Sequence, residues 1–191
     1  MSLEYAILGF LSYKPFSGYD LKKVFDNSVR HFWYADQSQI YRTLTRLTEE
    51  GLAEVEVVEQ TDRPDRKVYH ITSAGRAELN SWLRGPFPIQ QSHSGSLVQV
   101  FFAGQLTDAE ILSKFEEAAA IFRTILETFN EVPGKISEIV QMVDSPREEF
   151  FWMLTLELGM RTMQVQLEWA ESVIQRVRNQ QHPAQSGVYK Y

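Results

Sequence analysis

A run of amide, hydroxyl and guanidinium side chains between residues 36 and 50 has the chemistry needed to contact nucleic acid. Such groups bond base edges, and arginine also pairs with phosphate oxygens. Ile40, Leu44 and Leu47 interrupt the run at the spacing of one helical face, so most of the polar residues lie on the other side. We therefore predict a helix with one buried side and one side open to DNA. The candidate DNA contacts on this helix are Gln37, Ser38, Gln39, Tyr41, Arg42, Thr45 and Arg46.

The two ends of this helix are also marked in the sequence. Asp36 or Ser38 can cap its start, and Gly51 can adopt the left-handed conformation that ends a helix. An amphipathic helix with two arginines also fits an ordinary solvated surface, so the helix alone does not establish DNA binding. Tyr41 likewise fits either a phosphate contact or a place in the core.

A hairpin is predicted directly after the helix. Apolar and acidic residues alternate from 53 to 57, turn-forming residues fill 60–66, and 67–71 has the composition of a returning strand. Arg63, Arg66 and Lys67 concentrate positive charge near the turn, where they could reach phosphates or the minor groove. A helix bearing Arg and Gln, followed by a hairpin with a basic tip, is the order of a winged helix-turn-helix.

Residues on either side complete this predicted domain. An apolar stripe predicts a first helix at the start of the chain, and Ser17 can cap a second helix. After the hairpin, Thr72 can cap another helix. Glycine and proline residues then break regular structure, so we predict a DNA-binding domain over 1–85 and a linker over 86–96.

The second half of the chain has a helical pattern. Thr107 and Glu110 form a capping-box signature for one helix, which Pro133 and Gly134 are predicted to end, and Ser145 can cap the last helix. This last helix carries apolar residues at alternating spacings of four and three, a heptad pattern typical of contacts between helices. A second apolar row lies beside the first, so we expect one row to pack within the chain and one against a second subunit. The predicted dimerisation residues are Leu156, Met160, Met163, Leu167, Ala170, Ile174 and Val177.

The predicted fold is therefore mainly α. It consists of an N-terminal winged helix-turn-helix, with three helices and a two-stranded wing, followed by an α-helical dimerisation domain. We expect the dimerisation domain to cover 97–180 and the last residues, 181–191, to form a disordered tail.

Composition limits the classes of function. The chain of 191 residues has a formal net charge of −6, of which residues 1–85 contribute −1 from 11 basic and 12 acidic side chains. It has no cysteine, four scattered histidines, and none of the short motifs that mark metal, phosphate or nucleophile sites. These features favour neither an enzyme nor a cofactor or metal site. Because the chain has no run of about 18 apolar residues and no signal-like start, we expect a cytoplasmic protein without a membrane segment.

Four segments, taken in order, resemble the PadR family of transcriptional regulators: 3–11, 17–21, 38–52 and 66–76. The second half is similar, more loosely, to the helical dimerisation domain of longer family members, with 167–169 its best match. This resemblance implies a homodimer that binds a palindromic operator in double-stranded DNA, usually as a repressor. It also implies a response to a small aromatic effector, as in many family members.

Two residues depart from the family pattern. Arg42 stands where family members often have proline after the tyrosine, which adds a cation near the start of the reading helix. Val68 stands where they often have tyrosine, a change that we interpret as structurally neutral.

Two questions stay open at the level of sequence. Aromatic residues of the second half could line an effector pocket, but at helical spacing they fit a core as well. These residues are Phe101, Phe102, Phe122, Phe151, Trp152 and Trp169. The alternative function is a winged-helix protein-interaction module without specific DNA binding, which would suit the acidic net charge.

Overall fold

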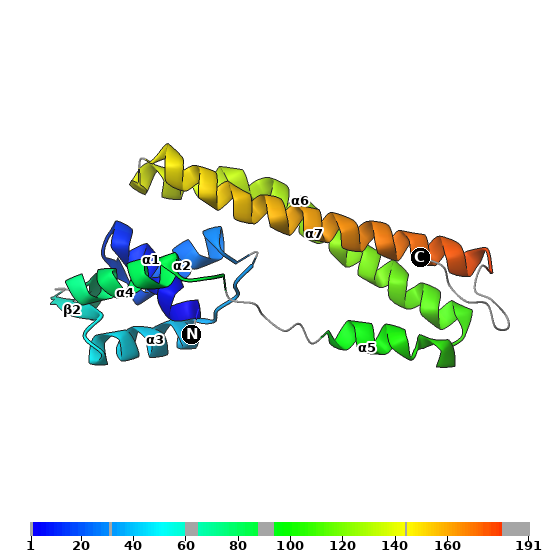
Figure 1. The fold of residues 1–191 in the computed structure, drawn as a ribbon, viewed down its shortest axis with the longest axis horizontal. Coiled ribbons are helices and arrows are strands. Elements are labelled where there is room, and N and C mark those ends of the chain that lie inside the picture. Colours follow the sequence, from blue (N-terminus) through cyan, green and yellow to red (C-terminus); the bar gives the residue numbers. More distant parts are fainter. Residues whose placement is uncertain (1, 31, 60–64, 88–93, 144, 181–191) are drawn as a thin grey trace. The chain divides into compact units, whose positions relative to one another are not determined.

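The computed structural model describes residues 2–30, 32–59, 65–87, 94–143 and 145–180, without the side chains of Ser2 and of residues 133–142. Contacts divide the chain into two compact units, whose helices α1 to α7 and strand β2 are labelled in Figure 1. Unit 1 comprises residues 1–88 and 132–152, and unit 2 comprises residues 89–131 and 153–191. The predicted tail at 181–191 and the candidate DNA contact Arg63 lie outside the described residues.

Three helices form the core of unit 1: α1 (Ser2–Tyr13), α2 (Gly18–Ser28) and α3 (Gln37–Glu49). Their apolar stripes meet in one cluster, in which Ile40, Leu44 and Leu47 of α3 have no exposed surface. Leu8 of α1 and Leu21 of α2 are equally inaccessible. Burying each such side chain stabilises the fold by roughly 1.5–3 kcal/mol. The three predicted helices of the winged helix-turn-helix are confirmed.

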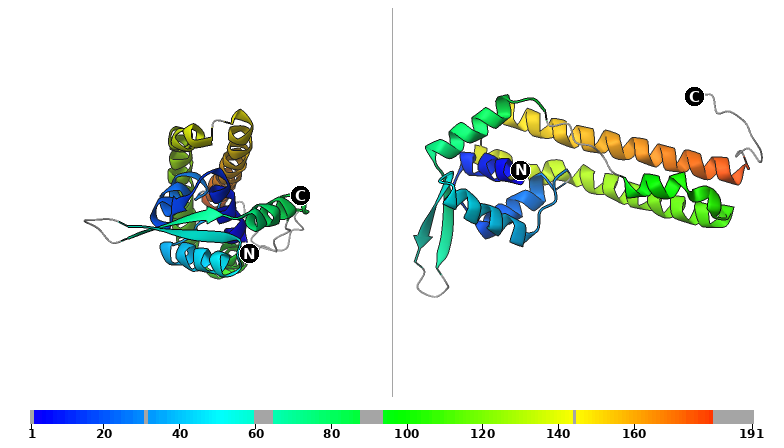
Figure 2. Two further views of the ribbon diagram at one scale, coloured as in Figure 1. Left: turned by 90° about the vertical axis from the view of Figure 1, so that its left-hand side faces the viewer. Right: turned by 60° about the horizontal axis from the view of Figure 1, so that its bottom comes forward.

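A three-stranded antiparallel sheet joins the same core. Its strands are β1 (Phe16–Ser17), β2 (Ala53–Val58) and β3 (Arg66–Ile71), in the order β1-β3-β2. Phe16 is opposite Tyr69 and Ala53 is opposite Ile71, which sets the register. The hairpin of β2 and β3 extends beyond the helices (Figure 2). The predicted two-stranded wing omitted β1, because a strand of two residues is too short to show alternation.

Helix α4 (Ser73–Arg84) follows the sheet and packs along α1. Thr72 caps α4 as predicted, since its Oγ1 accepts a hydrogen bond from the Gly75 N–H at 3.0 Å. Tyr5 of α1 stacks on Trp82 of α4 with ring centroids 4.5 Å apart. The start of α4 is therefore fixed beside the sheet, and its end is fixed against α1.

The end of α6 (Asp108–Val143) and the start of α7 (Pro146–Arg178) also belong to unit 1. Glu148 accepts a 2.9 Å hydrogen bond from the Tyr13 hydroxyl, and the Trp152 ring meets the Tyr13 ring edge-on at 5.9 Å. Burial and this hydrogen bond raise the pKa of Tyr13 to about 12, so the phenol keeps its proton at neutral pH. The sequence prediction assigned this segment to the helical domain, whereas its contacts group it with the winged helix.

Helix α6 runs without interruption through Pro133 and Gly134, so the prediction that these residues end it is wrong. Proline removes one backbone hydrogen bond and costs a helix about 3 kcal/mol. The parts of α6 before and after this point pack in different units, and packing on both sides can offset a local cost. The local sequence shows only the destabilising proline and not the packing that compensates for it.

The predicted starts of the two long helices are confirmed. The Thr107 N–H donates to the Glu110 carboxylate at 2.8 Å, and the Glu110 N–H donates to Thr107 Oγ1 at 3.4 Å, which completes a capping box. Ser145 Oγ accepts from the Glu148 N–H at 3.3 Å and caps α7, whose first residue is Pro146.

Unit 2 contains α5 (Gly95–Phe101), the short 3-10 helix η1 (Ala103–Gln105) and long parts of α6 and α7, which run antiparallel (Figure 1). Its buried cluster consists of Phe115, Ala119, Leu167, Ala170 and Ile174. Two ion pairs join α6 to α7, Arg123 to Glu171 at 2.5 Å and Arg178 to Glu116 at 2.6 Å. Among the described helices, none is long and apolar enough to span a membrane.

Most of the predicted dimerisation row is buried inside the chain. Leu156, Leu167, Ala170 and Ile174 are at most 8% exposed, and the last three pack against α6. Side chains covered in this way have no surface left for a second subunit, so the structure corrects the prediction for these four residues. Met160, Met163 and Val177 are half-buried. The second apolar row of α7 is more exposed to solvent. Leu154, Leu158, Val165 and Trp169 are 42, 67, 64 and 40% exposed.

A substitution at Gly75 can test whether α4 must approach the sheet closely. A Cβ at this position would lie 2.1 Å from the Leu52 carbonyl oxygen and 2.9 Å from Cγ1 of Ile71. Because backbone must move to admit it, we expect Gly75→Ala to lower the free energy of unfolding, measured by urea denaturation, by about 1–3 kcal/mol.

Gly9→Ala is the matched control for this change. Gly9 lies within α1, and an added Cβ there meets no neighbouring group within 4 Å. Alanine should therefore raise the free energy of unfolding, by up to about 1 kcal/mol, through its higher helix propensity. If both substitutions had the same effect, the close approach at Gly75 would have no energetic importance.

Candidate nucleic-acid interface

A capping box fixes the start of α3. The Asp36 carboxylate accepts from the Gln39 N–H at 2.8 Å, and the Gln39 side-chain oxygen accepts from the Asp36 N–H at 3.0 Å. Asp36 is therefore the cap, and Ser38 is not. The spacing Asp-x-x-Gln was a signal in the sequence that could have identified this arrangement. Gln39 was predicted to read a base, but its oxygen is already used within the protein.

A left-handed glycine ends α3 and leads into the wing, as predicted. Gly51 has φ 71°, and the Leu52 N–H donates to the Leu47 carbonyl at 2.8 Å across the turn. Thr72 Oγ1 also donates to the Gly51 carbonyl at 2.8 Å. The helix is consequently held at both ends, and its exposed face has a fixed direction.

The exposed face of α3 carries Gln37, Ser38, Arg42 and Thr45. Nε of Arg42 donates to the Ser38 carbonyl at 3.4 Å, so the guanidinium lies along the helix toward its start. Thr45 Oγ1 donates to the Tyr41 carbonyl at 3.0 Å. Within the described residues Arg42 makes no ion pair, which leaves its charge available to a base or a phosphate.

Arg46 is less available than its sequence position suggests. Its guanidinium pairs with the carboxylate of Glu4 in α1. Glu4 is mostly covered and Arg46 is half-exposed, so the pair lies at the edge of the core. An arginine held in this way must share or leave its carboxylate before it can contact a phosphate.

The ring of Tyr41 lies over the start of α2. A Cβ built on Gly18 would lie 2.4 Å from Cε1 of Tyr41, so only glycine allows so close an approach. The Tyr41 residue is still 38% exposed, and its hydroxyl has no hydrogen bond to another described residue. Both interpretations of Tyr41 therefore have support: the ring packs on α2, and the hydroxyl remains open to a phosphate.

The two described cations of the wing point to opposite faces of the hairpin. Arg66 and Lys67 are successive residues of β3, and successive residues of a strand face opposite sides. Arg66 pairs with the carboxylate of Asp20 in α2, whereas Lys67 has no acidic partner in the described part of the chain. Arg63, the third predicted wing contact, lies outside that part. The described part of the wing therefore presents one paired cation, Arg66, and one cation without an acidic partner there, Lys67.

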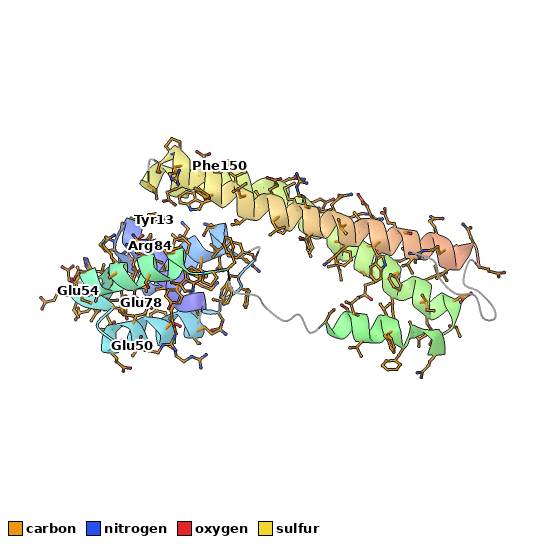
Figure 3. The ribbon with its side chains drawn as sticks, in the orientation of Figure 1. Tyr13, Glu50, Glu54, Glu78, Arg84 and Phe150 are labelled. Carbon is orange, nitrogen blue, oxygen red and sulfur yellow. The ribbon has the colours of Figure 1, made fainter. Side chains whose placement is uncertain are left out.

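Acidic side chains limit the part of this surface that can face DNA. Glu54 and Glu56 are exposed on β2, and Glu50 follows the last turn of α3. Figure 3 shows Glu50 and Glu54 at the outer edge of the unit. His70 Nε2 lies 3.0 Å from Glu56, which offsets one of these charges when the histidine is protonated. A DNA backbone is therefore better placed along Arg42 and the start of α3 than along β2.

Sites for small ligands or metals are less well marked. The six aromatic residues considered for an effector pocket are divided between the units, with Phe151 and Trp152 in unit 1 and the others in unit 2. A depression of about 540 Å³ in unit 2 is lined by none of them, and its charged residues include Arg123 and Glu171. In the described ranges no three His, Asp or Glu side chains are grouped so that they could hold a metal ion.

The structure adds two residues that sequence reasoning did not identify. Glu4 and Asp20 each bind an arginine that was predicted to contact DNA. Each pair joins residues that are far apart in the chain, so no local spacing could indicate it.

Comparison with known proteins shows which proteins this chain resembles. Residues 7–81 match the family described as transcriptional regulator PadR-like, and residues 94–178 match a domain described as virulence activator alpha C-term. The negative transcriptional regulator PadR of Bacillus subtilis is 27% identical over 173 residues, which are 90% of this chain and 95% of that protein.

Two solved structures of Bacillus subtilis PadR resemble the chain over most of its length. The complex with operator DNA has a TM-score of 0.79 at 28% identity, covering 93% of this chain and 99% of that chain. The complex with p-coumaric acid has a TM-score of 0.72 at 27% identity, covering 92% and 95%. These matches confirm the resemblance seen in the sequence and the expectation of a regulator rather than an enzyme. The chain therefore carries a PadR-like family domain at residues 7–81 and is a PadR-like, DNA-binding transcriptional regulator.

Proposed function

We propose that this PadR-like regulator is a repressor that binds an inverted-repeat operator as a homodimer and acts in the cytoplasm. The observation that carries the proposal is the exposed face of α3, where Arg42 has no acidic partner among the described residues. The name of the Bacillus subtilis relative, a negative transcriptional regulator, supports repression. The structure of that relative with operator DNA supports operator binding by a similar chain.

In this proposal α3 enters the major groove and Arg42 reads a base. The forked guanidinium can bond both O6 and N7 of guanine, and such a contact discriminates between bases by about 1–3 kcal/mol. Gln37 and Ser38 lie near the start of the same exposed face and can bond neighbouring bases or phosphates. Lys67 of the wing contacts a phosphate, which adds affinity for DNA but does not distinguish one base sequence from another.

A homodimer supplies the length of DNA that one α3 cannot read. One reading helix contacts only a few base pairs, and two copies about one helical turn apart specify a palindrome. The exposed apolar row of α7 offers a surface for the second copy, because Leu158 and Val165 repeat on one helical face. Contiguous apolar surface of this kind commonly marks a protein–protein contact.

A small aromatic acid is the proposed effector, because the Bacillus subtilis relative has been solved with p-coumaric acid. An effector changes operator affinity only if it binds the free and the DNA-bound dimer unequally. Titrating p-coumaric acid into the protein–operator complex, followed by fluorescence anisotropy of the DNA, tests this part of the proposal. We expect release of the operator, and an unchanged affinity at saturating acid would reject this compound as an effector.

Selection from a random pool of DNA duplexes tests the proposed function directly. The purified protein is mixed with the pool at about 150 mM salt, near physiological ionic strength, and bound duplexes are amplified and sequenced. We expect enrichment of one palindrome, whose half-sites give the operator. A pool that binds without enrichment would indicate phosphate contacts alone. No binding at all would favour the protein-interaction module instead.

Arg42→Ala tests the proposed base contact. Removing the guanidinium should weaken binding to the selected operator by about 1–3 kcal/mol, roughly 5- to 150-fold, and should relax base preference at one position of each half-site. The free energy of unfolding should change by less than about 0.5 kcal/mol, because the side chain is exposed. Anisotropy titrations with the operator and with its single-base variants measure both effects.

Arg176→Ala is the matched control. Arg176 is also an exposed helical arginine, and its Nε donates to the Ser172 carbonyl at 3.4 Å, as Nε of Arg42 does to Ser38. It lies on α7 in unit 2 and should leave operator affinity unchanged. Equal affinities for the wild-type protein and Arg42→Ala would remove Arg42 from the DNA interface.

Leu158→Glu tests the proposed dimer surface. Leu158 is largely exposed in the chain, so the charge should not disturb the packing of α6 on α7. It should instead prevent two apolar rows from meeting, which we expect to give monomers in analytical ultracentrifugation and to abolish tight operator binding. Leu167→Glu should unfold unit 2 instead, because Leu167 belongs to its buried cluster.

Gln175→Glu adds the same charge to an exposed position of α7 on a different face and serves as the control. It should leave the dimer and operator binding intact. A Leu158→Glu protein that remains dimeric would place the subunit contact elsewhere on the chain.

A further inference from the structure

Two acidic residues of unit 1 hold arginines that were predicted to contact DNA. Glu4 of α1 pairs with Arg46, and Asp20 of α2 pairs with Arg66 of the wing. The Glu4 side chain is only 18% exposed, so its pair belongs to the packing of α1 with α3. The side chains of Asp20 and Arg66 are 39% and 49% exposed. Both side chains of the second pair are therefore open to solvent, so a phosphate could approach the Arg66 guanidinium.

The Asp20 carboxylate is fixed in position at the start of α2. It accepts a hydrogen bond from the Ser17 hydroxyl at 2.6 Å, and the Asp20 N–H donates to the same hydroxyl oxygen at 3.2 Å. Burial alone would raise the pKa of Asp20, but the bonds from Ser17 and Arg66 outweigh burial and lower it. At neutral pH the guanidinium of Arg66 thus faces a fixed negative charge.

We propose that Asp20 attenuates DNA binding by competing with DNA phosphates for Arg66. The inference rests on the proposed function, because it concerns how tightly the winged helix holds its operator. Carboxylate and phosphate oxygens accept from a guanidinium in the same geometry, so Arg66 cannot serve both fully. Because Asp20 is part of the same chain, its effective concentration beside Arg66 is far higher than that of a loosely held phosphate.

This competition affects operator and non-operator DNA unequally. On non-operator DNA no base contact holds the duplex in one register, so phosphates pass the wing only transiently and Asp20 keeps Arg66. On the operator, the base contacts of α3 hold one phosphate beside the wing, and exchange of Asp20 for that phosphate becomes favourable. Operator binding therefore loses the whole free energy of the Asp20–Arg66 pair, whereas non-operator binding loses only the weaker contact that Arg66 would otherwise make. Asp20 weakens operator binding more than it weakens sequence-independent binding.

Asp20→Asn removes the competitor and keeps the shape of the side chain. Asparagine can still accept from Ser17, but it has no charge with which to hold Arg66. We expect binding to a mixed-sequence duplex to tighten by about threefold or more at about 150 mM salt. The plot of log K against log salt for this duplex should steepen by about 0.9, the value for one additional phosphate contact. Operator affinity should rise by more, because the operator no longer has to displace Asp20, so the ratio of the two affinities rises.

Glu116→Gln is the matched control for net charge. It removes a carboxylate that holds Arg178 at 2.6 Å, but the pair joins α6 to α7 within unit 2. This variant should bind both duplexes as the wild-type protein does. In an Arg66→Ala background, Asp20→Asn should no longer tighten binding, because the arginine that it releases is absent.

Arg66→Ala alone gives an independent test that leaves Asp20 unchanged. If Asp20 occupies Arg66 on non-operator DNA, removal of the guanidinium should leave that binding and its salt dependence nearly unaltered. Operator binding should weaken, and its salt slope should fall by about 0.9. Equal losses on both kinds of DNA would overturn the inference even if Asp20→Asn failed to fold.

The remaining outcomes separate this inference from the function on which it rests. An effect of Asp20→Asn no larger than that of Glu116→Gln would assign the effect to net charge alone. Weaker binding of both duplexes by Asp20→Asn would show that Asp20 positions Arg66 for DNA and does not compete with it. Either result, with a wild-type protein that still selects an operator, would reject only the inference. A wild-type protein that binds no duplex would reject both.

Discussion

The burial of one face of α3 determines what this protein can present to DNA. Ile40, Leu44 and Leu47 are completely buried, and together they fix the rotation of the helix about its axis. The outward direction of Arg42 and Thr45 then follows from the core and needs no further interaction. Replacing one of the buried leucines by alanine would lower the free energy of unfolding by about 2–5 kcal/mol. It would also leave the rotation of α3 about its axis less firmly fixed. The stability of the domain and the geometry of its DNA surface therefore depend on the same contacts.

The electrostatics of this surface favour short-range contacts over general attraction to DNA. The chain has a net charge of −6, and carboxylates lie beside two arginines of this surface, Glu4 beside Arg46 and Asp20 beside Arg66. Beyond one Debye length, about 8 Å at physiological salt, a polyanion responds only weakly to individual charges. Long-range steering toward DNA is then weak. In the proposed complex, the guanidinium of Arg42, which has no acidic partner among the described residues, then supplies a larger share of the affinity, and that share depends on sequence.

What could be predicted from sequence depended on residues close together in the chain. The stripe of α3, the left-handed Gly51 and the cap at Thr72 are local signals, and in order they define a winged helix. The features that were missed depend on distant partners. The two residues of β1 are a strand only because β3 lies beside them. Arg46 is paired only because folding brings Glu4 to it, so its availability could not be judged from α3 alone.

The two apolar rows of α7 show the same limit for the subunit contact. Heptad spacing indicates that a helix packs against another helix, but it does not indicate whether that helix belongs to the same chain or to a second subunit. In unit 2 the matching surface is α6, whose Phe115 and Ala119 pack against Leu167 and Ala170 and thereby occupy the regular row. In the proposed dimer, the contact made by α7 uses the outward row that contains Leu158. In a two-fold dimer the same row of both copies would meet, so the spacing of the two reading helices would depend on the less regular row.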